Sequence, residues 1–166
     1  MITSNLRYLF LLFLFCVPLH AQSHQILQVG EVPLTAYSSA KGDSTYYLLN
    51  FHIPNPIKSS GSISIEFPVE YQDSFDSTPE CGQISSQYIS LSCTVLATTF
   101  KISMGEILQG NYEIVVGHVK NPSNFEISRT FKIYTYQSEA LIDYNENFGK
   151  ISFSNPPGIY FFPSHF

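Results

Sequence analysis

The stretch STYYLLNFHIP, residues 44–54, decides the fold class, because apolar and polar side chains alternate along it. One side of an extended chain carries Tyr47, Leu49, Phe51 and Ile53, and the other carries Tyr46, Leu48, Asn50 and His52. A period of two residues with one apolar face is typical of a half-buried antiparallel strand. The sequence therefore predicts a β-strand here, with Phe51 in the core.

The same alternation returns in later segments, which glycine and proline turn signals separate from one another. Short strands with turns every 8–12 residues or so are typical of a sandwich or a barrel, and no segment after the N-terminal region shows helical periodicity. We predict an all-β fold, a two-sheet antiparallel β-sandwich that is Ig-like or cadherin-like, with about seven to nine strands. The predicted core faces carry Ile63, Ile65 and Phe67; Ile89, Leu91, Cys93 and Val95; Phe100, Ile102 and Met104; Tyr112, Ile114 and Val116; and Phe131, Ile133 and Thr135.

The N-terminal region has the three parts of a secretory signal. Arg7 precedes an uncharged apolar run over 8–19, and small or polar residues follow at 21–23. The run is about 12 residues long, whereas a membrane-spanning helix needs about 20. We therefore predict that residues 1–23 form a cleaved signal helix and that the mature chain is secreted, without a membrane span. The predicted sandwich domain covers 24–143, and 144–166 would be a C-terminal extension or the start of a truncated second module.

Charge excludes one class of partner. The chain has 8 Lys+Arg and 13 Asp+Glu, and loss of Arg7 with the signal leaves 7 against 13, a formal charge of −6. Nucleic-acid binding needs clustered positive charge, and no such cluster occurs. The expected partners are other extracellular proteins or a cell-surface matrix, and the sequence does not indicate the oligomeric state.

Two cysteines remain after the signal is removed, Cys81 and Cys93, because Cys16 leaves with it. Their spacing is not that of a Cys-x-x-Cys redox pair, and no histidines stand close enough in sequence to suggest zinc ligation with them. In an exported chain two remaining cysteines most simply pair with each other. We predict a disulfide, worth about 3 kcal/mol by the chain-entropy model, that ties an acidic loop to a strand edge.

The acidic segment EFPVEYQDSFDSTPE, residues 66–80, is the one local charge feature. Its oxygen ligands make Asp73 and Asp76 calcium candidates, although the segment lacks the spacing of an EF-hand, and a solvated loop is the favoured explanation. No Gly-x-Ser-x-Gly elbow or other nucleophile-and-base pattern occurs. We therefore expect no catalytic residues, no enzyme activity and no cofactor. Tyr134 and Tyr136 would either present a binding surface or cover the second sheet or a neighbouring domain.

The order of these features resembles the β-sandwich modules that recur in large, cysteine-bearing surface proteins of ciliates. The resemblance covers roughly residues 45–145. It rests on the strand SGSISIEFP, the cysteine pair, the Asn121-Pro122 that follows a strand, and the closing strand with Phe131, Ile133 and Thr135. It implies an extracellular adhesion or structural module and transfers no catalytic residues.

Two functions remain open at the level of sequence. The first is a secreted or cell-surface, non-catalytic β-sandwich module in adhesion or extracellular structure. The alternative is a secreted carrier that holds a small apolar ligand between its sheets, because abundant apolar and aromatic residues suit both. A ligand-binding residue cannot be assigned from the sequence for either.

Overall fold

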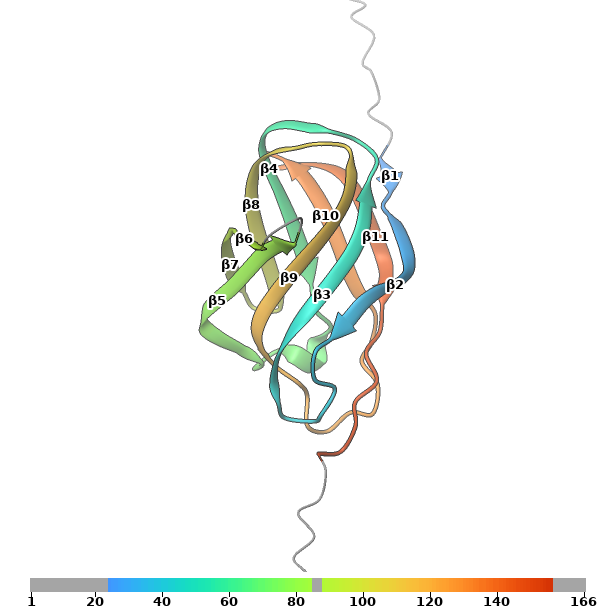
Figure 1. Cartoon of the computed structure of the whole chain (residues 1–166), viewed down its shortest axis with the longest axis vertical. Coiled ribbons are helices and arrows are strands. Elements are labelled where there is room, and N and C mark those ends of the chain that lie inside the picture. The colour runs from blue at the N-terminus through green and yellow to red at the C-terminus, as the bar shows by residue number, and fades with distance from the viewer. Residues whose placement is uncertain (1–23, 85–87, 157–166) are drawn as a thin grey trace, which may run out of the picture.

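Two β-sheets pack face to face in the computed structural model, which describes residues 24–84 and 88–156 (Figure 1). The predicted signal peptide, residues 1–23, lies outside the described residues. Sheet A has the order β1 (Gln25–Ile26), β11 (Ala140–Gly149), β10 (Phe131–Gln137), β4 (Ile57–Glu66), β8 (Thr99–Ile107), β7 (Ser92–Leu96). Sheet B has the order β2 (Gln28–Ala36), β3 (Ser44–Ile53), β9 (Gly110–Lys120), β5 (Phe75–Ile84), β6 (Tyr88–Ser90).

The predicted two-sheet β-sandwich is confirmed. Neighbouring strands in the described part of the chain run antiparallel, with the exception of β1, which pairs in parallel with β11. The described residues form eleven strands, more than the seven to nine predicted. The difference includes β1 and β6, which have two and three residues and are too short to show a period. One 3₁₀ turn, η1 (Val69–Tyr71), follows β4.

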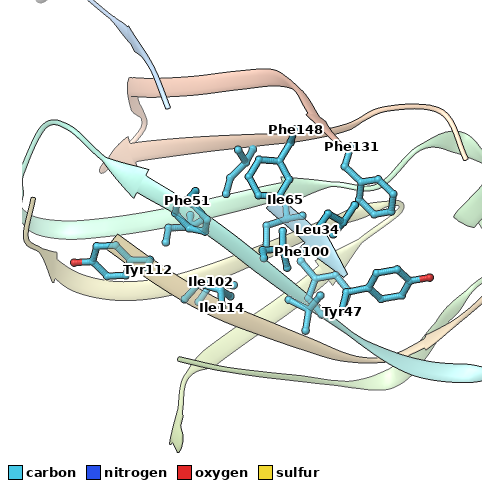
Figure 2. Close-up of a cluster of buried hydrophobic side chains, with 14 of the residues drawn as sticks. Leu34, Tyr47, Phe51, Ile65, Phe100, Ile102, Tyr112, Ile114, Phe131 and Phe148 are labelled. Carbon is cyan, nitrogen blue, oxygen red and sulfur yellow. The ribbon is translucent and has the colours of Figure 1, made fainter. Parts of the chain in front are cut away.

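The apolar faces of both sheets meet in one core, as the alternation predicts. In β3, Tyr47, Leu49, Phe51 and Ile53 are all buried. Figure 2 shows aromatic side chains of the two sheets facing one another, and the ring centroids of Phe51 and Phe148 lie 6.0 Å apart. Of the predicted core residues, Phe51, Ile65, Ile114 and Ile133 are buried, and Leu91 packs partly buried against the cluster.

Phe67, just after β4, is the centre of an aromatic cluster at one end of the core. Its ring centroid lies 4.8–5.6 Å from those of its neighbours, which come from both sheets and from η1: Tyr47, Tyr71, Phe75, Phe100 and Phe131. These edge-to-face and tilted contacts are the geometry that aromatic quadrupoles favour. Side chains therefore fill this part of the space between the sheets.

A buried polar cluster anchors the loops at this end of the sandwich. The Tyr47 hydroxyl donates to Asn121 Oδ1 and lies 2.9 Å from the Tyr71 hydroxyl. Asn121 Nδ2 donates to the carbonyl oxygens of Ser38 and Ala40 at 2.9 and 2.8 Å. The asparagine thus satisfies the backbone of the β2–β3 connection while it holds the chain as it leaves β9.

The predicted domain boundary at residue 143 is corrected by the structure. Residue 143 lies inside β11, which ends at Gly149. Beyond residue 143, the side chains of Phe148, Ile151 and Phe153 are part of the hydrophobic core. Ser154 forms a β-bridge with Ala40. The sandwich therefore includes residues to at least 154, because removing them would expose these apolar side chains.

Candidate functional site

Cys81 and Cys93 form a disulfide with a Cα–Cα distance of 6.2 Å. Cys81 lies within β5 of sheet B and Cys93 within β7 at the edge of sheet A, so the bond links the two sheets. The predicted tie between a loop and a strand edge is half correct. Cys93 is on an edge strand, but the acidic segment becomes strand β5 from Phe75 onward, and Cys81 pairs in register with Val116 of β9.

The two calcium candidates lie in different surroundings. Asp73 lines one surface depression, together with Glu70. Asp76 lines another and lies with its Oδ2 atom 3.7 Å from His118 Nδ1. Within residues 24–84 and 88–156, no three His, Cys, Asp or Glu side chains group closely enough to hold a metal ion. The structure therefore does not bring Asp73 and Asp76 together as one set of ligands.

Three tyrosines stand on the outer surface of sheet A, and we name them the tyrosine face: Tyr134, Tyr136 and Tyr144. Tyr134 is directly opposite Tyr144 of β11 in the strand register, and directly opposite residues of an antiparallel pair share a face. The ring centroids of Tyr134 and Tyr136 lie 6.4 Å apart. Since Phe131, Ile133 and Thr135 occupy the buried side of β10, Tyr134 and Tyr136 face away from the second sheet.

Small polar residues of β4 lie beside the tyrosine face. Ser64 is opposite Tyr134 and Ser62 is opposite Tyr136. At the next position along the strands, Lys132 Nζ donates to Glu66 Oε1 at 2.9 Å, and this hydrogen bond raises the pKa of Lys132. Burial raises the pKa values of Tyr134 and Tyr136, so these two rings remain neutral hydrogen-bonding groups at physiological pH.

The outer surface of sheet B carries a second polar cluster, around Tyr46. Its hydroxyl donates to Glu80 Oε2 at 3.0 Å, and His118 Nε2 lies 3.0 Å from the same oxygen. The hydrogen bond to Glu80 raises the pKa of Tyr46. Gly117 makes this arrangement possible, because a Cβ atom there would lie 2.2 Å from Tyr46 Cε1. The ring therefore rests directly on the backbone of β9.

A depression of about 490 Å³ opens where η1, the end of β9 and the β9–β10 connection meet, and we name it the end pocket. Its lining includes Glu70, Asp73, Lys120, Phe125 and Arg129. The Glu70 side chain is only 3% exposed. Its Oε1 atom accepts a hydrogen bond from the Arg129 backbone N–H at 2.9 Å, whereas its Oε2 atom is buried without a partner.

Sequence reasoning did not single out the end pocket. Glu70 was visible as one acidic residue of the segment 66–80, but nothing local marks it as buried. Its hydrogen-bond partner lies 59 positions away along the chain, and only the folded arrangement of the loops brings the two together.

Comparisons with known proteins add a distant structural similarity. No protein-family model matches the chain, and no curated protein matches it. A solved structure described as a family IIIa CBD from Clostridium cellulolyticum aligns over 78% of this chain and 99% of its own, at 11% identity and a TM-score of 0.35. A similarity of this size carries no argument about what this chain binds. The described residues contain no helix long and apolar enough to cross a membrane.

Proposed function

We propose that this protein is a secreted or cell-surface β-sandwich module that acts by contact, in adhesion or extracellular structure, and that it is not an enzyme. The observation that carries the proposal is the tyrosine face, which lies on the outside of β10 while the inward residues Phe131, Ile133 and Thr135 are buried. Tyrosine rings give a large contact area at low cost in conformational entropy, and their hydroxyls bond a partner. The resemblance to repeated ciliate surface modules supports the same function.

The inter-sheet disulfide supports an extracellular location. Cys81 is 1% exposed and Cys93 is partly buried, so the bond belongs to the architecture of the sandwich. Structural disulfides persist in oxidising compartments and are rare in reducing ones. Together with the predicted signal over residues 1–23, the bond favours export of the chain.

The carrier alternative requires ligand space between the sheets. In the part of the interior around Phe67, rings from both sheets occupy that space at centroid distances of 4.8–5.6 Å. At the other end, Phe51 stacks with Tyr112 and meets Phe148 edge-on. An apolar ligand would have to displace packed side chains, so no observation on the described residues favours the carrier.

Export is tested by expression of the full chain in secreting eukaryotic cells. We expect the protein in the medium, with an N-terminus between Gln22 and His24 and with Cys81 and Cys93 joined in non-reducing peptide mapping. Retention of the uncleaved chain inside the cells, or two free thiols in the secreted product, would contradict the proposed location.

Contact through the tyrosine face is tested with beads that carry the domain and are presented to cells expressing the same chain. We expect the variant Tyr134→Ser/Tyr136→Ser to lose most of the bead adhesion. The matched control is Tyr37→Ser, because Tyr37 is 67% exposed and lies outside the tyrosine face. Equal adhesion of both variants and wild type, or adhesion no greater than that of uncoated beads, would refute this role.

A further inference from the structure

The outer surface of sheet A has a ridge of long side chains beside a furrow of short ones. The residues that point outward from β10 are all long: Lys132, Tyr134 and Tyr136. The residues of β4 that lie opposite them in the strand register are one carboxylate and two small hydroxyls: Glu66, Ser64 and Ser62. Ser62 is only 4% exposed, so the open part of the furrow lies at Ser64, between Tyr134 of β10 and Lys101 of β8.

The charged groups of this surface balance one another. Lys132 Nζ and Glu66 Oε1 lie 2.9 Å apart, with side chains 37% and 39% exposed. Lys101 is exposed on β8. The hydrogen bond to Glu66 raises the pKa of Lys132, and the charge of Glu146 on β11 adds to this rise, which places Glu146 beside the same group. Two lysines and two glutamates leave no net formal charge here, although the chain without its predicted signal has a charge of −6. Two copies of an acidic chain repel each other in general, but not through this surface.

A two-fold rotation makes the ridge and the furrow complementary. If the axis runs parallel to the strands, between β10 and β4, the rotation leaves each residue at the same level along the strands. It therefore lays β10 of each copy over β4 of the other copy. Tyr134 of each copy then lies over Ser64 of the other, and Lys132 lies over Glu66. The two ion pairs thereby become a ring of alternating charges, in which each group has an opposite charge both beside it and across from it.

The flanking strands match in the same rotation. β8 is next to β4 and β11 is next to β10, so β8 of each copy lies over β11 of the other. Four outward residues share one level across these strands: Lys101, Ser64, Tyr134 and Tyr144. Lys101 therefore meets the ring of Tyr144, a cation–π contact, close to the carboxylate of Glu146. Face-to-face sheets cross at about 30°, so the match is closest near the axis, where Tyr134 and the ion pairs lie.

We propose that the tyrosine face pairs with the tyrosine face of a second copy of this chain, in a two-fold dimer whose axis lies between β10 and β4. The inference rests on the proposed function, for which it names the partner. A foreign partner would need no furrow beside the ridge and no opposite charges on neighbouring strands, whereas a second copy uses both. An isologous contact of this kind closes as a dimer, and between two surfaces that display the chain it makes adhesion homophilic.

Charge reversal tests the contact between Lys132 and Glu66 of different copies. We expect Lys132→Glu and Glu66→Lys each to weaken self-association of the secreted chain about tenfold in sedimentation equilibrium, because symmetry repeats every like-charge contact twice. An equimolar mixture of the two variants should form a heterodimer as stable as the wild-type dimer, since opposite charges again face each other. Lys120→Glu changes the net charge equally but lies on sheet B, and it should associate as wild type. A wild-type chain that stays monomeric at millimolar concentration, or a mixture that does not recover, would overturn the proposal.

The bead assay separates this inference from the proposed function. We expect wild-type beads to adhere to cells that express the chain and not to cells that lack it. Beads with Lys132→Glu should adhere better to cells expressing Glu66→Lys than to cells expressing Lys132→Glu. Equal adhesion to cells that lack the chain, if Tyr134→Ser/Tyr136→Ser abolishes it, would refute the second copy as partner and leave the contact function in place. A dimer in solution without any bead adhesion would refute the adhesion function and leave the pairing in place.

Discussion

Removal of the Cys81–Cys93 disulfide should lower the stability of the sandwich by an amount that the loop length sets. The two cysteines are 12 positions apart, and the chain-entropy model gives about 3 kcal/mol at 25 °C for a loop of this size. Alanine is the better replacement at position 81, because the site is only 1% exposed and a serine hydroxyl there would add the cost of an unsatisfied buried group.

This free energy converts into a melting shift through the size of the domain. Residues 24–156 number 133, and about 2.1 cal/mol/K per residue gives an entropy of unfolding near 0.28 kcal/mol/K. Loss of about 3 kcal/mol therefore predicts a fall in melting temperature of about 10 °C. The single variants Cys81→Ala and Cys93→Ala should each show nearly the whole fall, since either one breaks the same bond, and Cys81→Ala/Cys93→Ala should add little.

The assay is differential scanning calorimetry of wild type and the three variants, with and without a phosphine reductant. We expect the reductant to lower the melting temperature of wild type to that of the double variant and to leave the double variant unchanged. A fall of less than about 3 °C in the double variant, well short of the predicted 10 °C, would show that the disulfide does not constrain the unfolded chain as argued. Additive single-variant effects would show that the cysteines act through separate packing contacts.

Three further predictions concern the core and the outer surface of sheet B. Phe67→Ala should lower the free energy of unfolding, measured by urea denaturation at constant m-value, by about 3–5 kcal/mol. A decrease below about 1 kcal/mol would contradict the central place of this ring in the core. Burial raises the pKa values of Tyr47 and Tyr71 above the ordinary 10.0. The unfolded chain therefore loses these protons first, and stability should fall above pH 10 by about 1.4 kcal/mol per pH unit for each tyrosine. In alkaline melts Tyr47→Phe should lower this slope by about 1.4 kcal/mol per pH unit, and an unchanged slope would refute the assignment. Gly117→Ala should lower the free energy of unfolding by about 1–3 kcal/mol, because the added methyl group overpacks against the Tyr46 ring. In a double-mutant cycle, the second substitution Tyr46→Ala should remove most of this destabilisation. A coupling energy of zero would mean that the ring does not lie on Gly117.

The strand faces were predictable because a period of two is local information. Phe51, Ile65, Ile114 and Ile133 are buried, as the alternation predicts. Leu91 is only partly buried, since it precedes β7 at the edge of sheet A, where fewer neighbours cover a side chain. Alternation assigns a residue to a face but does not state how close its strand lies to the middle of a sheet.

The domain boundary was not predictable, because β11 breaks the alternation. Its pairing with β10 shifts register twice, between Phe131 and Ile133 and between Thr135 and Tyr136, and each irregularity changes which side chains face inward. Two polar residues of β11, Asp143 and Asn145, are buried in consequence. A sequence pattern that places polar residues inward after residue 142 looks like the end of a strand, although the strand continues.

The chemistry of the candidate sites depends on contacts that no local pattern encodes. The disulfide pairing followed from compartment and counting, but its crossing from sheet B to sheet A followed from the strand order, which many sandwich topologies with the same alternation do not share. The end pocket shows this dependence on tertiary contacts more clearly than the disulfide does. The Glu70 side chain is buried beside Tyr71, whose ring contacts those of Tyr47 and Phe67, and Arg129, far along the chain, supplies a backbone donor to it. An exposed loop glutamate would look the same in sequence, so the burial of Glu70 and its unpartnered Oε2 atom exist only at the level of tertiary structure.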